Sequence, residues 1–411
     1  MEQFLKNLKN STKTIALLEP SVKTDILNQM AKALRKNFQI IINENKKDLI
    51  EGKSSNLSSA LLDRLLLDKS RVEAMATAIN EIAILKEPVG RILDGWVVPS
   101  GLRIEKVSIP IGVIAIIYES RPNVTSDTAA LCFKSGNVCV LKGGKEAAHS
   151  NKIIAEILQE VLTKNNLPKE IISLIPDNSR EAVAKLIKMD KYIDLVIPRG
   201  GEGLIKYISA NSSVPVIKHD KGLCHTYIDK DANIKDAIKI AVNAKCQRTG
   251  VCNAMETLLV HVDIADEVLK RLKEVYDSHG TELRGCQNTI EVIDIKLANE
   301  EDFNTEYLDN ILSIKIVKDV NEAIEHINDY GSGHSEAIIT ENYTTGEHFL
   351  NSVDSACVYI NASTRFTDGA EFGFGAEVGI STNKLHSRGP MGINDLTTYK
   401  FKIYGKGNAR A

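Results

Sequence analysis

Short apolar runs alternate with amphipathic segments through the middle of this chain, and this alternation constrains the fold more than any other feature. Buried strands are predicted over residues 112–118, 138–142, 171–175 and 194–197. Amphipathic helices are predicted between them, over residues 126–135, 146–164 and 180–188. Buried strands joined by helices form a parallel sheet whose two faces the helices cover. Such a sheet binds its ligands at the carboxyl ends of its strands.

The segments on either side of this sheet predict a second unit and an extended arm. Residues 1 to about 95 have the apolar spacing of helices, and residues 95–111 alternate around a Pro-Ser-Gly turn as a β-hairpin does. A second run of alternating strands and helices extends from about 233 to 362. The tail, 385–411, ends in an extended run without a sequential partner, so we expect another subunit to complete this edge.

Composition excludes several classes of protein. The chain has 411 residues, enough for two or three domains, with 43% hydrophobic residues and a net charge of −3. A net charge this small and negative does not attract nucleic acid or an anionic membrane surface. No apolar run approaches the ~20 residues of a membrane span. The amino terminus lacks the apolar core of a signal peptide, and the seven cysteines show no paired short spacing. We therefore expect a reduced, soluble, cytoplasmic protein.

One cysteine stands in a setting suited to chemistry. In the segment NAKCQRTGVCNAME, Cys252 lies between small residues and just before a predicted buried strand at 257–260. Gly250 allows the backbone to approach a ligand closely, and Ala254 leaves space beside the sulfur. A thiol on a loop that precedes a rigid strand is well placed to act as a nucleophile. Free cysteines are often buried in protein cores, so the spacing alone also allows a packing role for Cys252 in place of a nucleophilic one.

Two glycine-bearing loops each follow a predicted strand and precede a helix. KGGKE at 142–146 and PRGGEG at 198–203 both offer backbone N–H groups and a helix amino terminus to a phosphate, with Lys145 or Arg199 adding charge. Neither loop is the GxGxxG fingerprint of dinucleotide-binding folds, so a tight structural turn is the alternative for each loop taken alone. Two such loops on one sheet favour a dinucleotide site.

A polar segment, ESRPNVT at 119–125, lies at the carboxyl end of the first predicted strand. Pro122 disfavours a helical conformation at Arg121, and the amide of Asn123 can donate to an oxyanion or instead cap a helix. The histidines show no spacing typical of metal ligands, so we expect no metal.

Seven segments carry a resemblance that covers essentially the whole chain. They are YESRPNVTSD, LKGGKEA, IPRGGEGLI, KHDKGLCHTYID, KCQRTGVCNAMETLLVH, INDYGSGHSEAIIT and EFGFGAEVGISTNKLHSRGPMGINDLTTYKF. Together they resemble the aldehyde dehydrogenase superfamily, and the last three resemble its branch that reduces an acyl phosphate. The resemblance implies an α/β fold with two Rossmann-like parallel-sheet domains and a β oligomerisation arm. It implies an NADP-binding domain over 1–97 and 118–232, a catalytic domain over 233–384, and an arm over 98–117 and 385–411.

The resemblance also implies roles for individual residues. Cys252 matches the catalytic thiol and Asn123 the oxyanion asparagine, although a strict count along the helix would put Glu119 there. Lys145 falls where NAD-preferring relatives often carry a glutamate, and a cation there favours the 2′-phosphate of NADP. The expected cofactor is therefore NADPH. Its expected binding residues are Lys142, Gly143, Gly144, Lys145, Pro198, Arg199, Gly200, Gly201 and Glu306.

The activity that the resemblance implies is the NADPH-dependent reduction of L-glutamyl 5-phosphate to L-glutamate 5-semialdehyde through a cysteine thioester, the second step of proline biosynthesis. Hydrolytic members of the superfamily carry a water-activating glutamate in an ELGG-like segment, and here KHDKG puts His219 or a neighbour in that place. Losing this base protects a thioester from water, although His219 could itself act as a base. The substrate is expected to contact Arg121, His334, Asn361, Ser363, Thr364 and Arg365. A surface ion pair is the alternative for each arginine.

Two rival functions share parts of this pattern. An acylating aldehyde dehydrogenase that uses coenzyme A would employ the same thiol and differ in its acyl acceptor. A catalytically silent nucleotide-binding protein would keep the fold, but the intact setting of Cys252 argues against it. As partners we expect further copies of the chain, in a dimer or tetramer. A contact with the upstream glutamate 5-kinase is also attractive, because acyl phosphates are short-lived in water.

Overall fold

The computed structural model describes residues 1–218 and 221–410, which form two compact units. Unit 1 comprises Met1–Lys218, Gly373–Gly379 and Met391–Ala411, and unit 2 comprises His219–Phe372 and Ile380–Pro390. Each unit has a parallel sheet of its own and its own buried apolar core. The expected α/β fold with two parallel-sheet units is confirmed.

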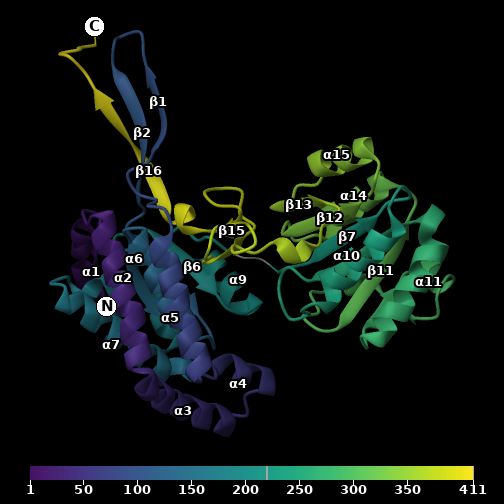
Figure 1. Ribbon diagram of the computed structural model, residues 1–411, viewed down its shortest axis with the longest axis horizontal. Helices are drawn as coiled ribbons and strands as arrows, with labels where there is room; N and C mark the ends of the chain where they lie inside the picture. Colours follow the sequence, from purple (N-terminus) through teal and green to yellow (C-terminus); the bar gives the residue numbers. More distant parts are fainter. Residues whose placement is uncertain (219–220, 411) are drawn as a thin grey trace. The chain divides into compact units, whose positions relative to one another are not determined.

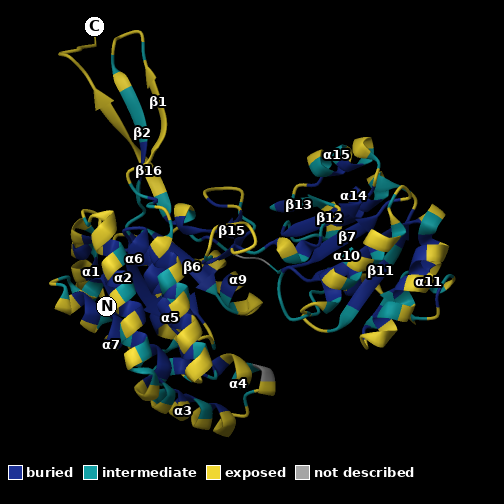
Figure 2. Cartoon of the chain, in the orientation of Figure 1, coloured by how far each residue is buried: buried dark blue, intermediate teal, exposed yellow. Residues whose placement is uncertain are grey.

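The sheet of unit 1 has four parallel strands in the order β5-β4-β3-β6. Its strands are β3 (Val113–Tyr118), β4 (Val138–Lys142), β5 (Ile172–Leu174) and β6 (Leu195–Arg199). The predicted apolar runs therefore form strands, because β-branched residues buried on both faces suit the centre of a parallel sheet. Every residue of β3 and β4 is buried. Figure 2 shows the buried residues in dark blue behind the helices of this unit.

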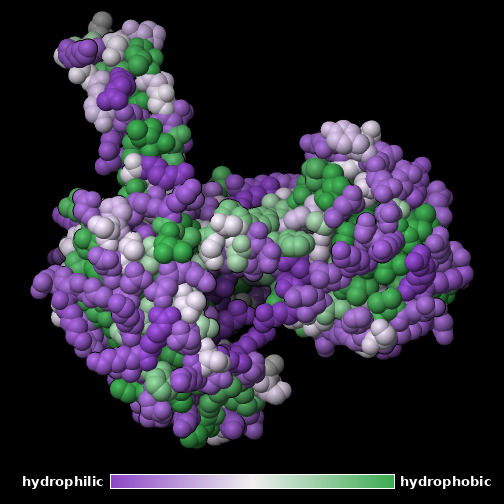
Figure 3. All heavy atoms as spheres, viewed as in Figure 1, coloured by the Kyte–Doolittle hydropathy of each residue, from purple (hydrophilic) through white to green (hydrophobic). Residues whose placement is uncertain are grey.

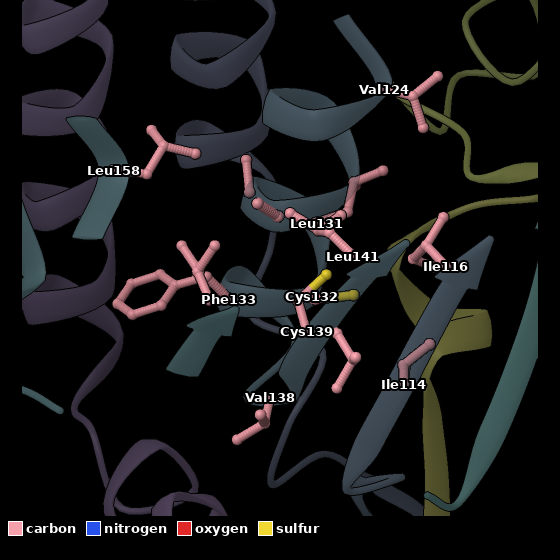
Figure 4. Packing of buried hydrophobic residues seen from close by; sticks show 14 of the residues in the cluster. Ile114, Ile116, Val124, Leu131, Cys132, Phe133, Val138, Cys139, Leu141 and Leu158 are labelled. Atoms are coloured by element: carbon pink, nitrogen blue, oxygen red, sulfur yellow. The ribbon is translucent and has the colours of Figure 1, made fainter. Parts of the chain in front are cut away.

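Helices cover this sheet. They are α1 (Glu2–Ile15), α2 (Pro20–Lys36), α3 (Phe38–Ser54), α4 (Ser59–Leu65), α5 (Lys69–Ile84), α6 (Asn123–Lys134), α7 (Ala148–Lys164), α8 (Arg180–Leu186) and α9 (Glu202–Asn211), with short 3-10 helices at Lys145–Ala147, Lys169–Ile171 and Ile393–Leu396. The starts of α5 and α8 are fixed by Asp68 and Ser179, whose side chains accept N–H bonds of the first turn. Figure 4 shows Leu131 of α6 beside Leu141 of β4, and Phe133 of the same helix in the same core.

A three-stranded antiparallel sheet extends from unit 1 as an arm, with the order β1-β2-β16 (Figure 1). Its strands are β1 (Ile92–Val97), β2 (Arg103–Pro110) and β16 (Thr397–Tyr404). The predicted hairpin is confirmed, but the arm begins at residue 92, and residues 113–117, expected in it, belong to β3. The terminal strand has a partner within the chain, and pairing of its outer edge with another subunit stays a prediction. β16 pairs with the chain's own β2 along its full length, from Thr397 opposite Pro110 to Tyr404 opposite Arg103.

The sheet of unit 2 has seven parallel strands in the order β10-β9-β11-β8-β7-β12-β13. They are β7 (Cys224–Ile228), β8 (Met255–His261), β9 (Glu282–Gly285), β10 (Lys296–Leu297), β11 (Ile311–Val317), β12 (Ser335–Ile339) and β13 (Cys357–Ile360). Strand β7, which the sequence placed in the first domain, pairs with β8 and β12 at the centre of this sheet. The second unit therefore begins before residue 233, because a central strand cannot be separated from its two neighbours.

The helices of unit 2 connect these strands. They are α10 (Ile234–Cys246), α11 (Val262–Ser278), α12 (Gln287–Ile290), α13 (Glu300–Asn304), α14 (Val320–Tyr330) and α15 (Tyr343–Ser352), with a 3-10 helix at Thr364–Phe366. Strands β14 (Gly379–Ser381) and β15 (Gly389–Met391) pair with each other where the chain passes between the units. Among the described residues, no helix combines the length and the apolar character needed to cross a membrane.

Candidate functional site

The candidate nucleophile lies in unit 2, on the loop between α10 and β8, hereafter the cysteine loop (residues 247–254). Cys252 is half-buried, and the loop leads directly into β8, all of whose residues are buried. Asn253 ties the loop to the segment after β13, because its Nδ2 donates to the Thr367 carbonyl at 2.8 Å and its own carbonyl accepts from Thr364 Oγ1 at 2.8 Å. The thiol therefore stands on a loop fixed at its base, as the sequence predicted.

A glycine that the sequence interpretation passed over lies against the backbone of Cys252. A Cβ added at Gly222 would overlap the Cys252 carbonyl oxygen and Cα and lie 2.5 Å from its carbonyl carbon. No side chain fits there, so this position requires glycine. Gly250, which the sequence singled out, is less crowded: the nearest atom to an added Cβ is the Leu308 carbonyl oxygen at 3.6 Å. Only the fold reveals this difference, because Gly222 and Cys252 are 30 residues apart in the sequence and come into contact through folding.

A second thiol lies behind the cysteine loop. Cys224 Sγ donates to the Cys252 carbonyl at 3.2 Å and lies 3.6 Å from His334 Nδ1. Burial raises the pKa of the Cys224 thiol well above its usual value, so this group stays protonated. His334 is fully buried and contacts Ser335 Oγ at 2.8 Å. The structure thus brings His334, an expected substrate residue, to the inner side of the cysteine loop.

Three other expected substrate residues also lie beside this loop. Ser363 caps the 3-10 helix that contains Thr364 and Arg365, and Arg365 Nε donates to Gln247 Oε1 at 2.9 Å. Burial lowers the pKa of Arg365, the neighbouring Arg248 adds to this effect, and Cys252 opposes it. A guanidinium thus lies in the electrostatic reach of the thiol.

Asn361 has a different environment. Its Nδ2 donates to the Thr340 carbonyl at 2.8 Å, and its Oδ1 accepts from the Thr340 N–H at 2.9 Å. Both ends of this amide therefore join the carboxyl end of β12 to the end of β13. The backbone of Asn361 has a φ of +54°, a conformation in which asparagine is favoured among non-glycine residues.

Glu306, expected at the nicotinamide ribose, lies on the segment between α13 and β11. This segment contacts the base of the cysteine loop, since the Leu308 N–H donates to Glu256 Oε1 at 3.3 Å. Burial raises the pKa of Glu256 to about 7, and Glu306 contributes to this rise although Lys245 opposes it. Glu306 and Cys252 therefore belong to one neighbourhood of unit 2.

The expected cofactor loops lie together at one edge of the sheet in unit 1. Tyr118 of β3 is opposite Arg199 of β6, and Ile117 is opposite Lys142 of β4, so the loops that follow these strands share the carboxyl edge. Side chains lie close to the glycines of both loops. A Cβ at Gly143 would overlap the Asn151 amide, and one at Gly200 would lie 2.6 Å from Glu119 Oε2.

Two lysines mark the first of these loops. Lys142 is buried and donates to the Gly143 carbonyl at 3.0 Å, and burial lowers its pKa while Asp177 opposes the change. Lys145 is exposed, at the start of the short helix before α7. An exposed lysine at the end of a parallel strand is accessible to a ligand phosphate.

The second loop presents backbone donors. Gly201 is the N-cap of α9, a helix of 10 residues, and its N–H donates to Glu119 Oε2 at 2.8 Å. A carboxylate thus already accepts a hydrogen bond at this helix amino terminus, where negative charge is favourable. Pro198 and Arg199 end β6 directly before the loop.

Asn123 is the first residue of α6, whose N-cap is Pro122, and it makes no capping bond, so the helix-cap interpretation is wrong. Its Nδ2 donates to Asp127 Oδ2 at 2.9 Å, and burial raises the pKa of Asp127 to about 6. Arg121 is exposed beside it. His219 lies outside the described residues. Within the part of the chain that the structure describes, no group of three or more His, Cys, Asp or Glu residues could hold a metal ion.

Comparisons with known proteins extend over the whole chain. The family model described as "Aldehyde dehydrogenase family" matches residues 1–282 and 295–401. The chain is 67% identical to the gamma-glutamyl phosphate reductase of Nitratiruptor sp. and 65% identical to that of Nautilia profundicola, with 100% of each chain covered. It also matches the crystal structure of gamma-glutamyl phosphate reductase from Thermotoga maritima with a TM-score of 0.98 and 44% identity, over 100% of this chain and 99% of that one.

Proposed function

This chain belongs to the aldehyde dehydrogenase family and, within it, to the gamma-glutamyl phosphate reductases, and from this we propose that it reduces L-glutamyl 5-phosphate to L-glutamate 5-semialdehyde and phosphate with NADPH. The observation that carries the proposal is the presentation of Cys252 on a fixed loop before a buried strand, with Gly222 held against its backbone. The reaction would be the second step of proline biosynthesis.

The thiolate of Cys252 attacks the γ-acyl carbon of the substrate, and phosphate leaves, so that the acyl group becomes a thioester. The N–H of Cys252 and the amide of Asn123 are the proposed donors to the oxyanion that develops, and removal of one such donor costs about 3 kcal/mol in other enzymes. Because burial keeps Cys224 protonated, it does not compete as a nucleophile.

The loops of unit 1 suit a dinucleotide. They follow β4 and β6, the two neighbours of β3, at the carboxyl edge where such sheets bind ligands, and the second loop leads into the amino terminus of α9, where negative charge is favourable. We propose that these loops and Lys142 hold NADPH, which when bound would supply the hydride for the thioester carbon. Exposed Lys145 would select NADPH over NADH by pairing with the 2′-phosphate. Glu306 is the proposed partner of the nicotinamide ribose.

We propose that Arg365 binds the α-carboxylate of the substrate, because it lies beside the cysteine loop and its backbone is fixed by Ser363. Ser363, Thr364 and His334 would line the same neighbourhood, and Arg121 is the candidate for the leaving phosphate. Asn361 would act indirectly by fixing the ends of β12 and β13. His219, in the place of the hydrolytic glutamate, would leave the thioester protected from water.

The test runs the reaction in reverse, from the semialdehyde, supplied as its cyclic imine, and phosphate. Absorbance of the reduced cofactor is followed with NADP and NAD in parallel. Cys252→Ala should abolish the activity, whereas Cys286→Ala, the removal of another half-buried thiol, should preserve it. Phosphate-dependent reduction of NADP that the first variant lacks supports the proposal. Dependence on coenzyme A would favour the other acylating reaction, and the absence of any turnover would favour a silent nucleotide-binding protein.

The arm is the proposed means of oligomerisation, into a dimer or tetramer. Apolar side chains on it are exposed, among them Trp96, Val97, Phe401 and Ile403, and Figure 3 shows green apolar atoms along the arm. Burial of such a patch stabilises association. We further propose a cytoplasmic location and a contact with glutamate 5-kinase, which would shorten the exposure of the acyl phosphate to water. Light scattering of the chain alone and with the kinase tests both associations.

A further inference from the structure

An ion pair joins the two ends of the cysteine loop. Lys245 lies in the last turn of α10 and Glu256 is the second residue of β8, so the loop that carries Cys252 lies between them. Lys245 Nζ is 2.6 Å from Glu256 Oε2, and both side chains are 0% exposed. A charge-assisted bond therefore closes the loop at its base, inside the protein.

The same carboxylate holds a third segment. Its other oxygen, Oε1, accepts the N–H of Leu308 at 3.3 Å. Leu308 has a φ of +52°, an uncommon conformation for leucine that its surroundings must maintain. Tyr307 continues the connection, since its hydroxyl contacts Asp302 Oδ1 and Ser313 Oγ, each at 2.9 Å. Glu256 thus links the cysteine loop to the segment that contains Glu306.

Stability alone does not account for this pair. Two buried charges have lost their hydration, which offsets their attraction. Apolar side chains of similar volume in place of a buried ion pair often stabilise the folded protein equally well or better. Burial raises the pKa of Glu256 to about 7 even though Lys245 lies beside it. A buried pair that apolar side chains could replace without loss of stability, at the base of the loop with the candidate nucleophile, suggests a different role.

We propose that Lys245 and Glu256 are positioning residues for the reaction, which fix the cysteine loop and the Glu306 segment relative to each other. This inference rests on the proposed function, in which Cys252 is the nucleophile and Glu306 contacts the cofactor ribose. Neither member of the pair is proposed to touch the substrate. The pair acts through the backbone of the loop on one side and the Leu308 N–H on the other.

The decisive variant is Lys245→Met/Glu256→Leu, which removes both charges and fills their space. We expect it to retain the wild-type thermal unfolding midpoint but to lower kcat about 10-fold or more and to raise the KM for NADPH, because displacements of about 1 Å reduce rates up to ~100-fold. The control is Lys23→Met/Glu87→Leu, which removes a 2.5 Å pair of unit 1 with Lys23 also buried. This control should keep both kinetic constants.

A stable double variant with wild-type kcat and KM would overturn the proposal. If it does not fold, Glu256→Gln replaces it, since this change removes the charge and keeps the shape; full activity in Glu256→Gln would equally overturn it. Hydrogen exchange separates this inference from the proposed function. Even if the wild type showed no reductase activity, faster exchange of the cysteine loop and Leu308 amides in the variant would support the positioning role of the Lys245–Glu256 pair, and unchanged exchange would refute it.

Discussion

Replacement of Gly222 by alanine is the most direct test of how the fold holds Cys252, the proposed nucleophile. The added Cβ would overlap the Cys252 carbonyl oxygen and Cα and lie 2.5 Å from its carbonyl carbon. All three are backbone atoms, so no rotation of a side chain can relieve the overlap. The two segments must separate by about 1.5 Å before the added carbon reaches an ordinary contact distance from the carbonyl oxygen.

The magnitude follows from this displacement. A shift of about 1 Å at a reacting group lowers the rate up to ~100-fold, which corresponds to about 2.7 kcal/mol of transition-state stabilisation. Overpacking of this kind also lowers the free energy of unfolding by about 1–3 kcal/mol. The Cys224 thiol, which donates to the displaced carbonyl, would lose its acceptor as well.

The assay compares Gly222→Ala with Gly250→Ala, whose new Cβ would lie 3.6 Å from its nearest neighbour. Phosphate-dependent reduction of NADP gives kcat/KM, and mass spectrometry follows the alkylation of Cys252 by iodoacetamide. We expect a large loss for the first variant and a change within about twofold for the second. Wild-type kcat/KM and an unchanged unfolding midpoint in Gly222→Ala would refute this account of the backbone contact.

Three further predictions concern charges. Lys145→Glu should raise the KM for NADPH about 10- to 100-fold and improve the use of NADH, because one charge-assisted phosphate contact contributes about 1.5–3 kcal/mol. Steady-state kinetics with both cofactors measure this change, and an unchanged preference for NADPH over NADH would contradict the prediction. The pKa of Glu256 is 4.5 in the unfolded chain and about 7 in the folded protein, so the folded state binds the proton more tightly. The free energy of unfolding should therefore fall by about 3 kcal/mol as the pH rises from 4.5 to 7. Glu256→Gln should remove that part of the slope in denaturant unfolding at pH 5 and pH 8, and an identical slope would argue against the shift. Lys23→Met should lower the free energy of unfolding by about 1.5–3 kcal/mol, because the Lys134 carbonyl and the partly exposed Glu87 carboxylate both lose the lysine as a donor. A loss below about 1 kcal/mol in urea would show that water replaces the lysine.

Local pattern in the sequence determined which elements form. The apolar runs of β3, β4 and β6 and the helical spacing between them depend on neighbouring residues, so their periodicity predicted a parallel sheet with loops at one edge. The same holds for the hairpin of β1 and β2 and for the strand that follows Cys252. The proposed cofactor loops could be found for this reason, since a loop that follows a strand lies at its carboxyl end.

Tertiary structure decided everything that depends on segments distant in the chain. No periodicity shows that β7 lies between β8 and β12, or that β16 pairs with the chain's own β2, because each pairing joins segments that are distant in the chain. The contact of Gly222 with Cys252 and the bond from Leu308 to Glu256 arise likewise from folding. The sequence by itself therefore determined the elements and the candidate thiol, and the packing of distant backbones determined what holds that thiol in place.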